Sequence, residues 1–401
     1  MKRIMLAITC YLLSFGLSYG SGPVIAATFG ASATIAFTPL IDNFDSGHAP
    51  NFWGGGYYPL NTGGGRALSI NYDSSQHSGS TGGSLRIDYG VPSSGDWAGM
   101  QITLAPASGT RPIVGSYRYL TFDIKGAIAG QSFKIEFQGS GGTKSHIYLT
   151  DYLDGGTSTG WQTVQIPLDA FANYSSAGAI TDLQYINLVF EHDYFTACGM
   201  STGSSVYIDN LAFGTTQLSA VRMDHFGDNY GLDALGGNMG GMGTNGDSAL
   251  ISFDTTNFKT FARSLKVNYS APTGNWAGCY FIIGGGATGN VATAHDFSAY
   301  SKLKISVAGA TGIAPPEKFR IELVSTNGTS SVYVPIDPAC DTWSIVGPQI
   351  SSTSWNTYTI NLSSFTALNK ATIMQMNIIF DGANVIVPTG TVYFDDIDFA
   401  Q

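Results

Sequence analysis

A tryptophan followed by alternating polar side chains occurs twice in the sequence, as WAGMQITL starting at Trp97 and as WAGCYFII starting at Trp276. In a β-strand, residues two apart lie on the same face, so Trp97 shares a face with Gln101, and Trp276 with Tyr280. Flat aromatic rings beside amide and hydroxyl groups suit a ligand that presents hydroxyl groups and weakly polar faces. These residue types at this spacing predict a surface that binds sugars.

Later segments add charged and amide side chains to the same predicted faces. FKIEF (133–137) aligns with FRIEL (319–323), and LQYINLVFE (183–191) aligns with IMQMNIIFD (373–381). The polar members are Lys134, Glu136, Asn187 and Glu191 in the first copy, and Arg320, Glu322, Asn377 and Asp381 in the second. The first copy also has an aromatic cluster, of which Trp53 and Tyr57 are included in the predicted site. The alternative interpretation is a solvated sheet face on which each tryptophan folds back to cover the core.

The elements that must position these residues come from an internal duplication. The stretch 84–104 recurs as 264–283, the opening IDNFDSG at 41 matches RMDHFGDNYG at 222, and the remaining strand-like segments follow in the same order. Apolar and polar residues alternate within the segments, as in strands buried on one face. The sequence therefore predicts an all-β protein of two tandem β-sandwich (jelly-roll) domains, 41–216 and 221–401, with no helix outside the N-terminal segment.

Composition supports that fold class and narrows the partners. Only 11% of the 401 residues are charged, whereas the chain has 51 Gly, 21 Tyr and 23 Phe, which suits β-sheets with tight turns. Residues 1–27 have the pattern of a secretory signal peptide, followed by a lead-in segment, 28–40, so we expect a secreted or cell-surface protein without membrane insertion after signal removal. Loss of Lys2 and Arg3 leaves 16 basic against 28 acidic residues, about −12, which argues against nucleic acid as a partner.

Acidic residues and cysteines give two further predictions. Carboxylates gather near the start and end of each copy, where first and last strands are expected to be neighbours; they are Asp42, Asp45 and Asp209 in the first copy, and Asp224, Asp228 and Asp395 in the second. They suit a hard cation such as calcium, and turn formation is the equally weighted alternative. Of three cysteines after the signal, Cys279 and Cys340 are the preferred pair for a disulfide.

The motifs together resemble a known group of folds. The opening Asp-x-Phe, the glycine-rich stretch, the Ser-Leu-Arg/Lys strand, the Trp-x-Gly turn and the closing Tyr-Ile-Asp-Asn are similar to galactose-binding-like jelly rolls. Within that group they resemble carbohydrate-binding modules of family 11 and complex-I-intermediate-associated-protein-like domains. The resemblance implies a poly- or oligosaccharide ligand and one structural calcium in each copy, with no organic cofactor.

Three functions are consistent with the sequence. The leading hypothesis is non-catalytic binding of a polysaccharide, chiefly by the first copy. The second is a structural matrix protein that self-associates through its Tyr-rich and Gly-rich loops, and the third is a polysaccharide hydrolase or lyase. Signals for catalysis are weak, because Glu191 and His192 are adjacent in a predicted strand and so point to opposite faces. No catalytic residue is assigned.

Overall fold

The computed structural model describes most of residues 39–401, and all structural statements below concern the described residues. The residues outside the description are 1–38, 106–116, 140, 143, 154, 173–182, 217, 228–232, 236, 245–248, 261–262, 284–290, 293, 311–317, 327–331, 334–339, 351–352, 367, 384 and 386. The predicted signal peptide (1–27) and nearly all of the lead-in segment therefore lie outside the described residues, as does Asp228.

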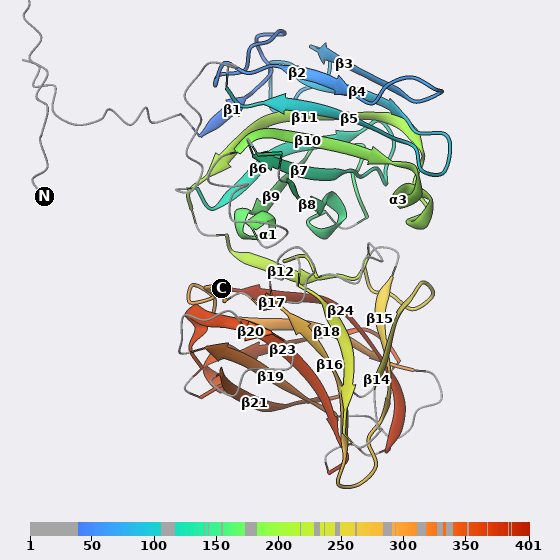
Figure 1. Cartoon of the computed structure of the whole chain (residues 1–401), viewed down its shortest axis with the longest axis vertical. Helices are drawn as coiled ribbons and strands as arrows, with labels where there is room; N and C mark the ends of the chain where they lie inside the picture. The colour runs from blue at the N-terminus through green and yellow to red at the C-terminus, as the bar shows by residue number, and fades with distance from the viewer. Residues whose placement is uncertain are drawn as a thin grey trace, which may run out of the picture. The chain divides into compact units, whose positions relative to one another are not determined.

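The first half of the chain forms two antiparallel sheets that make one sandwich (Figure 1). The six-stranded sheet has the spatial order β3 (Ala67–Asp73), β4 (Ser84–Gly90), β11 (Gly203–Gly214), β6 (Tyr119–Gly126) and β9 (Gln162–Pro167), with β1 (Leu40–Asp42) paired to β11. The five-stranded sheet has the order β2 (Tyr57–Leu60), β5 (Trp97–Thr103), β10 (Leu183–Glu191), β7 (Lys134–Gly139) and β8 (Lys144–Tyr148).

The second half repeats this arrangement strand for strand. Its six-stranded sheet has the order β14 (Ala249–Asp254), β15 (Ser264–Ser270), β24 (Thr389–Ala400), β18 (Lys302–Gly309) and β22 (Asn356–Asn361), with β12 (Ala220–Asp224) paired to β24. Its five-stranded sheet has the order β13 (Met239–Gly243), β16 (Trp276–Ile282), β23 (Ile373–Asp381), β19 (Lys318–Thr326) and β21 (Cys340–Gln349), and β17 (Val291–Ala292) pairs with β20 (Val332–Tyr333). The predicted all-β class with two tandem sandwiches is confirmed.

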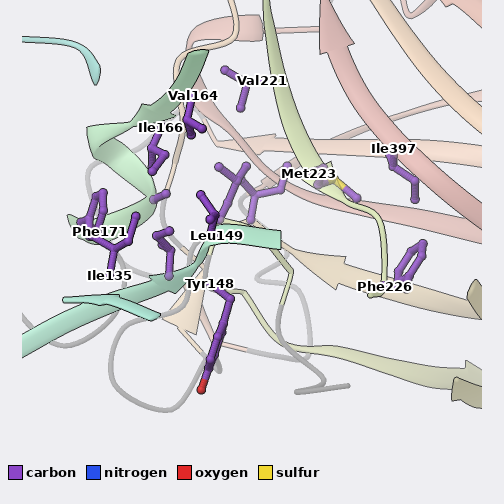
Figure 2. Packing of buried hydrophobic residues seen from close by; sticks show 14 of the residues in the cluster. Ile135, Tyr148, Leu149, Val164, Ile166, Phe171, Val221, Met223, Phe226 and Ile397 are labelled. Atoms are coloured by element: carbon purple, nitrogen blue, oxygen red, sulfur yellow. The ribbon is translucent and has the colours of Figure 1, made fainter. Parts of the chain in front are cut away.

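The inner packing of the two sandwiches is conserved in detail. Tyr89 stacks on Phe190 with ring centroids 4.1 Å apart, and the equivalent Tyr269 stacks on Phe380 at 4.0 Å. Each ring pair bridges the two sheets of its sandwich, because Tyr89 and Tyr269 lie on β4 and β15. Most of the buried hydrophobic residues form a single large cluster, part of which is shown in Figure 2. Burial of large side chains contributes about 1.5–3 kcal/mol each, so these cores fix both sandwiches.

Short helices interrupt the strand order and correct the prediction that there are none. The α-helices are α1 (Leu168–Ala172) and α3 (His192–Ala197), and the 3-10 helices are η2 (Leu149–Asp151), η4 (Leu362–Ser364) and η5 (Lys370–Thr372). Helix α1 follows Pro167 and buries Phe171, which stacks on Phe137 at 3.7 Å. No helix of the described residues has the length and apolar character needed to cross a membrane.

Candidate functional site

The five-stranded sheet of the first sandwich carries a row of polar side chains on its outer face. Residues directly opposite one another on antiparallel strands share a face. One such row crosses all five strands, and its members are Tyr58, Gln101, Asn187, Glu136 and His146. The adjacent rows add Lys134 beside Tyr148, and Trp97 beside Glu191. The six residues predicted for this face, five polar residues and one tryptophan, therefore all lie on it in the structure.

Asn187 is the centre of a hydrogen-bond network on that face. Its amide oxygen accepts a bond from Gln101 Nε2 at 3.3 Å, and its Nδ2 donates to Gln138 Oε1 at 3.2 Å and to Glu136 Oε2 at 3.5 Å. Asn187 and Glu136 are both buried although they point away from the core. Their amide and carboxylate orientations are therefore fixed before any ligand arrives.

A chain of opposite charges runs beside this network. The Lys134 ammonium lies 2.7 Å from Glu191 Oε1 and 3.1 Å from Glu136 Oε1, and the Lys144 ammonium lies 2.9 Å from Glu136 Oε2. Tyr148 donates its hydroxyl hydrogen to Glu191 Oε2 at 3.2 Å. Two basic and two acidic groups balance within the network, so the face presents fixed donors and acceptors without excess charge.

The pKa values follow from this arrangement. Burial would lower the pKa of Lys134, but the carboxylates of Glu191 and Glu136 outweigh it, and that pKa is raised. Burial would raise the pKa of Glu136, but the Lys134 and Lys144 ammonium groups outweigh it, and that pKa is lowered. Burial, reinforced by the same two lysines, lowers the pKa of His146 to about 4. His146 is therefore a neutral imidazole near pH 7, able to donate one hydrogen bond and accept another.

Two exposed aromatic rings border the polar row. The Trp97 side chain is 39% exposed and Tyr58 is 53% exposed, so neither is part of the core. Asn61 Nδ2 donates to the Trp97 carbonyl oxygen at 2.7 Å, which ties the chain after β2 to the start of β5. The alternative interpretation, in which Trp97 folds back over the core, does not fit this exposure.

Two predicted aromatic residues of the site face the other way. Trp53 is buried and stacks on Phe213 at 5.6 Å, and the Tyr57 hydroxyl donates to the carboxylate of Asp42 in the interior. The reason is the register of β2, in which Tyr57 lies opposite Ile102 and only Tyr58 lies opposite a residue of the polar face. Trp53 is therefore corrected to a core residue, and Tyr57 to a half-buried residue that packs against the core.

Sequence reasoning missed part of this face. His146 and Tyr148 lie on β8, and β8 was not among the predicted strands; Gln138 lies just beyond the aligned FKIEF segment. The sequence KSHIY at 144–148 does not alternate apolar and polar residues, because the inward-facing Ser145 is polar, and it therefore gave no strand signal. Tyr58 was within the aromatic cluster, but two adjacent tyrosines gave no basis for choosing which one points outward.

The second sandwich has an equivalent face with a related network. Tyr280, Asn377 and Glu322 are direct cross-strand neighbours, and Asn377 Nδ2 donates to Glu322 Oε2 at 3.2 Å. Arg320 bridges two acids, Glu322 at 3.0 Å and Asp381 at 3.2 Å, as Lys134 does in the first sandwich. Trp276 lies opposite Asp381 and is half-buried. All six residues predicted for this face share it.

This second face is less open to a polar ligand than the first. Ile282 and Val324 occupy the positions of Thr103 and Gln138, and with Met374 they form a small buried apolar cluster apart from the main core. Tyr280 packs against that cluster. Its ring also covers Gly240, where a Cβ atom would lie 2.5 Å from the tyrosine oxygen. The polar surface that surrounds the network in the first sandwich is thus partly replaced by apolar packing.

The acids predicted to bind calcium accept hydrogen bonds from the protein itself. Asp42 and Asp224 each accept a backbone hydrogen bond from a phenylalanine with left-handed φ two residues on, Phe44 at 2.8 Å and Phe226 at 2.7 Å. This is the turn chemistry that was the alternative. Burial, which outweighs these bonds, raises the pKa of Asp42.

The remaining acids also accept hydrogen bonds from the protein. Asp45 Oδ1 accepts from Gly83 N at 3.0 Å, and Asp209 accepts from the backbone N–H groups of Ser78 at 2.8 Å and Asn210 at 2.7 Å. Among described residues, no group of three or more His, Cys, Asp or Glu side chains is arranged to hold a metal ion. As arranged, these carboxylates do not fit a calcium cage, and calcium in the first sandwich stays a prediction.

The predicted disulfide is not formed at Cys279. Its thiol is free and buried, because the side chain points into the core of the second sandwich from β16. Burial raises the pKa of this thiol far above its ordinary value, so it behaves as an inert small apolar group. The preferred pairing of Cys279 with Cys340 is therefore wrong.

Carbohydrate-binding modules are among the solved structures that are similar to the chain. Among solved structures, the chain is similar to a family 11 carbohydrate-binding module of a cellulosomal cellulase of Clostridium thermocellum, with 16% identity, a TM-score of 0.33, and coverage of 46% of this chain and 96% of that chain. A family 30 module from another cellulosomal cellulase of Clostridium thermocellum has 18% identity and a TM-score of 0.33, covering 40% and 92%. A tandem pair of family 22 modules from Paenibacillus barcinonensis has 13% identity and a TM-score of 0.32, covering 92% and 100%.

No curated protein matches the chain in sequence. A family model, however, matches it twice: carbohydrate binding domain 30 aligns with residues 41–215 and again with residues 226–401. The two matches correspond to the two sandwiches and together account for most of the 401 residues. With one copy of the domain in each sandwich, the chain belongs to the carbohydrate binding domain 30 family.

Proposed function

We propose that the chain is a secreted, non-catalytic polysaccharide-binding protein, and that its principal binding surface is the outer face of the sheet β2–β5–β10–β7–β8. The observation that carries the proposal is the polar row centred on Asn187, in which each amide and carboxylate is held by a neighbour. Exposed rings of Tyr58 and Trp97 border this row. Preorganised polar groups bind hydroxyl groups without the entropic cost of ordering, and aromatic rings cover the apolar face of a sugar.

The paired charges favour a neutral glycan. Lys134 and Lys144 are both engaged with carboxylates, so a charged ligand group would have to compete for a partner that is already within 3.1 Å. Hydroxyl groups need only the unused lone pairs and hydrogens of the same side chains. A neutral polysaccharide is therefore the ligand class that this face accommodates without breaking an ion pair.

The same network argues against hydrolysis. A general acid for glycoside cleavage needs a carboxyl group whose pKa is raised, so that it holds a proton near neutral pH. The pKa of Glu136 is lowered by its two lysines, and Glu191 is paired with Lys134. Reducing-sugar release from a panel of polysaccharides tests this point directly, and release that is lost in Glu136→Gln would overturn the non-catalytic assignment.

Retention on insoluble polysaccharides tests the proposed face. We expect Trp97→Ala and Tyr58→Ala each to weaken binding about tenfold, which corresponds to about 1.4 kcal/mol of lost contact. The matched control is Phe258→Ala, since Phe258 is 41% exposed but lies outside both five-stranded sheets. If Phe258→Ala weakens retention as much as the other two variants, the loss is not specific to this face and the assignment is refuted.

Secretion and assembly need separate measurements. N-terminal sequencing of protein recovered from the culture medium tests removal of residues 1–27, and an intact Met1 there would contradict the signal peptide. The second candidate function is self-assembly through exposed surface residues such as Phe52 and Leu250. Size-exclusion chromatography with light scattering distinguishes the two, because the binding proposal expects a monomer whose retention on polysaccharide does not depend on protein concentration.

A further inference from the structure

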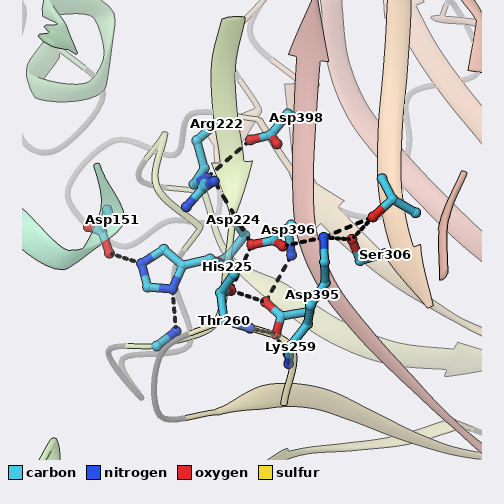
Figure 3. Close-up of polar contacts among 12 residues, drawn as sticks. Asp151, Arg222, Asp224, His225, Lys259, Thr260, Ser306, Asp395, Asp396 and Asp398 are labelled. Carbon is cyan, nitrogen blue, oxygen red and sulfur yellow. Dashed lines mark hydrogen bonds and ion pairs between the residues drawn. The ribbon is translucent and has the colours of Figure 1, made fainter. Parts of the chain in front are cut away.

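A single lysine side chain joins three strands of the second sandwich. Lys259 Nζ donates to Asp396 Oδ2 at 2.9 Å on β24, to Ser306 Oγ at 2.9 Å on β18 and to Thr357 Oγ1 at 2.8 Å on β22 (Figure 3). Asp396 and Ser306 are buried, whereas the Lys259 side chain is 34% exposed. All three ammonium hydrogens of Lys259 are thus used within the protein.

The backbone of the same residue holds the neighbouring acid. Lys259 N–H donates to Asp395 Oδ2 at 2.8 Å, and Thr260 donates to Asp395 through its N–H at 3.1 Å and to Asp396 Oδ1 through its hydroxyl at 2.7 Å. Asp395 is fully buried, and burial together with the Asp396 carboxylate raises its pKa to about 6. Arg222 reaches Asp396 only at 3.9 Å. Of these two adjacent buried acids, Asp396 therefore has the Lys259 ammonium as a close cation, whereas Asp395 is held by backbone N–H groups and by Thr260.

The equivalent positions of the first sandwich make corresponding contacts without a lysine. The residue equivalent to Lys259 is Ser78, whose N–H makes the equivalent bond to Asp209 at 2.8 Å. The residue equivalent to Asp396 is Asn210, whose Nδ2 donates to Asp123 Oδ2 at 2.8 Å, and Asp123 takes the place of Ser306. Between the copies, one carboxylate has moved from β6 to the strand equivalent to β11, and a lysine has appeared beside it.

At Asp396 the backbone of β24 has a left-handed φ of 46°, and the pairing of β24 with β18 shifts register there. We propose that Lys259 is a built-in cation that holds this irregular part of β24 in place, so that the second sandwich needs no divalent metal there. Calcium requires six to eight oxygen ligands, and the oxygen atoms of Asp396, Ser306 and Thr357 that face this centre are already bound to the ammonium. A metal ion at these atoms would displace Lys259 or lie against its positive charge. The calcium implied for this copy by family resemblance, with Asp395 as a ligand, does not fit the described residues at this centre.

Hydrogen exchange on the full chain, read from peptides that cover β24 and residues 254–260, tests this inference. We expect Lys259→Met to speed exchange in these peptides about tenfold while peptides of the first sandwich remain unchanged. The double variant Lys259→Met/Asp396→Asn, which restores the amide found in the first copy, should return exchange to within about twofold of the parent, because the unbalanced acid is removed. Added calcium should leave these peptides unchanged in the parent.

The matched control is Lys266→Met. Lys266 is 32% exposed, and its ammonium lies 6.0 Å from the centre of the Tyr393 ring on β24 and 3.8 Å from Asp254, which is too far for a hydrogen bond. Its removal should change exchange by less than about twofold. Calcium-dependent protection of β24 in the parent would overturn the inference. Unchanged exchange in Lys259→Met, or a double variant as labile as the single one, would also overturn it. If Lys259→Met does not fold, the folded double variant still decides the outcome.

Discussion

Removing the Lys134 ammonium group, which lies beside the hydrogen-bond network of Asn187, should destabilise the first sandwich in a pH-dependent way. Lys134 contacts both Glu191 and Glu136, and its side chain is nearly buried. Breaking a buried ion pair by deleting one partner costs about 3–5 kcal/mol. Glu136 keeps Lys144, but that lysine is 47% exposed and solvent limits its contribution to under about 1 kcal/mol. We therefore expect Lys134→Met to cost about 2–3 kcal/mol at pH 7, or roughly 5–10 °C in Tm for a domain of this size.

The sign of the pH dependence follows from the pKa of Glu136. In the parent this pKa is below the ordinary value of 4.5, so the carboxylate contributes stability above pH 4.5 that is lost as pH falls through the lower folded value. Lys134 has a raised pKa and stays charged throughout this range. Without Lys134, burial dominates and raises the Glu136 pKa, so the acid is neutralised by mild acid. The difference between parent and variant should be largest at pH 7 and shrink toward pH 4.

Urea unfolding of parent and variant at pH 7, 5.5 and 4 measures this difference. The control is Lys144→Met, which removes the exposed lysine of the same network and should cost less than about 1 kcal/mol at every pH. An equal loss of stability for Lys134→Met at pH 7 and pH 4 would refute the electrostatic reasoning. Such a result would assign the loss to packing of the lysine stem instead.

Three other substitutions test separate parts of the structure. Trp53→Ala should cost about 3–5 kcal/mol in urea unfolding, because the ring is a core residue, while the folded variant keeps its retention on polysaccharide; selective loss of retention would contradict this. His146→Gln should remove a loss of stability that occurs as pH falls from about 6.5 to 4, because in this range His146 is protonated in the unfolded chain but still neutral in the folded protein. An unaltered profile of stability against pH would be inconsistent with the lowered pKa. Gly278→Ala should destabilise the protein by more than about 1 kcal/mol, and by more than Gly99→Ala does. A Cβ atom at Gly278 would lie 2.3 Å from a backbone oxygen of β23, whereas one at Gly99 would lie 3.0 Å from a backbone oxygen of β10. Equal shifts in Tm for the two variants would contradict this geometry.

The alternation of apolar and polar residues was enough to predict the fold and most of one face. Trp97 and Gln101 were assigned to one side of β5 by counting in twos, and the register confirms that Gln101 lies opposite Asn187. Counting failed where the sequence offers no alternation. Tyr57 and Tyr58 are adjacent aromatics on an edge strand, and only pairing with β5 determines which one packs against the core.

Other features depended on contacts that are distant in sequence. No helix was predicted after Pro167, but the segment forms α1, in which Phe171 stacks on Phe137. The acids near the start and end of each copy were predicted to gather around calcium. Nothing local in the sequence indicated that Lys259 would contact Asp396, which is 137 positions away in the chain. Local pattern predicts strands well, whereas partner choice across sheets requires the three-dimensional register.

Comparison of the two copies separates the scaffold of the face from the residues that distinguish its ligands. The Asn–Glu contact is retained, as Asn187 with Glu136 and as Asn377 with Glu322, although the second face is partly closed by apolar packing. Because both partners are buried in the first copy, we infer that this contact holds the sheet surface in place. That role explains why the contact is kept on the second face, which is less open to a ligand.

The residues at the two ends of that row are the ones that differ. Tyr58 is replaced by Gly240 at one end, and His146 is replaced by Ser344 at the other. Ligand selectivity should therefore reside in Tyr58 and His146, while Asn187 supports them. On this argument Tyr58→Gly reduces glycan affinity without lowering Tm, whereas Asn187→Leu lowers both, and a Tm that is unchanged in Asn187→Leu would remove Asn187 from the scaffold.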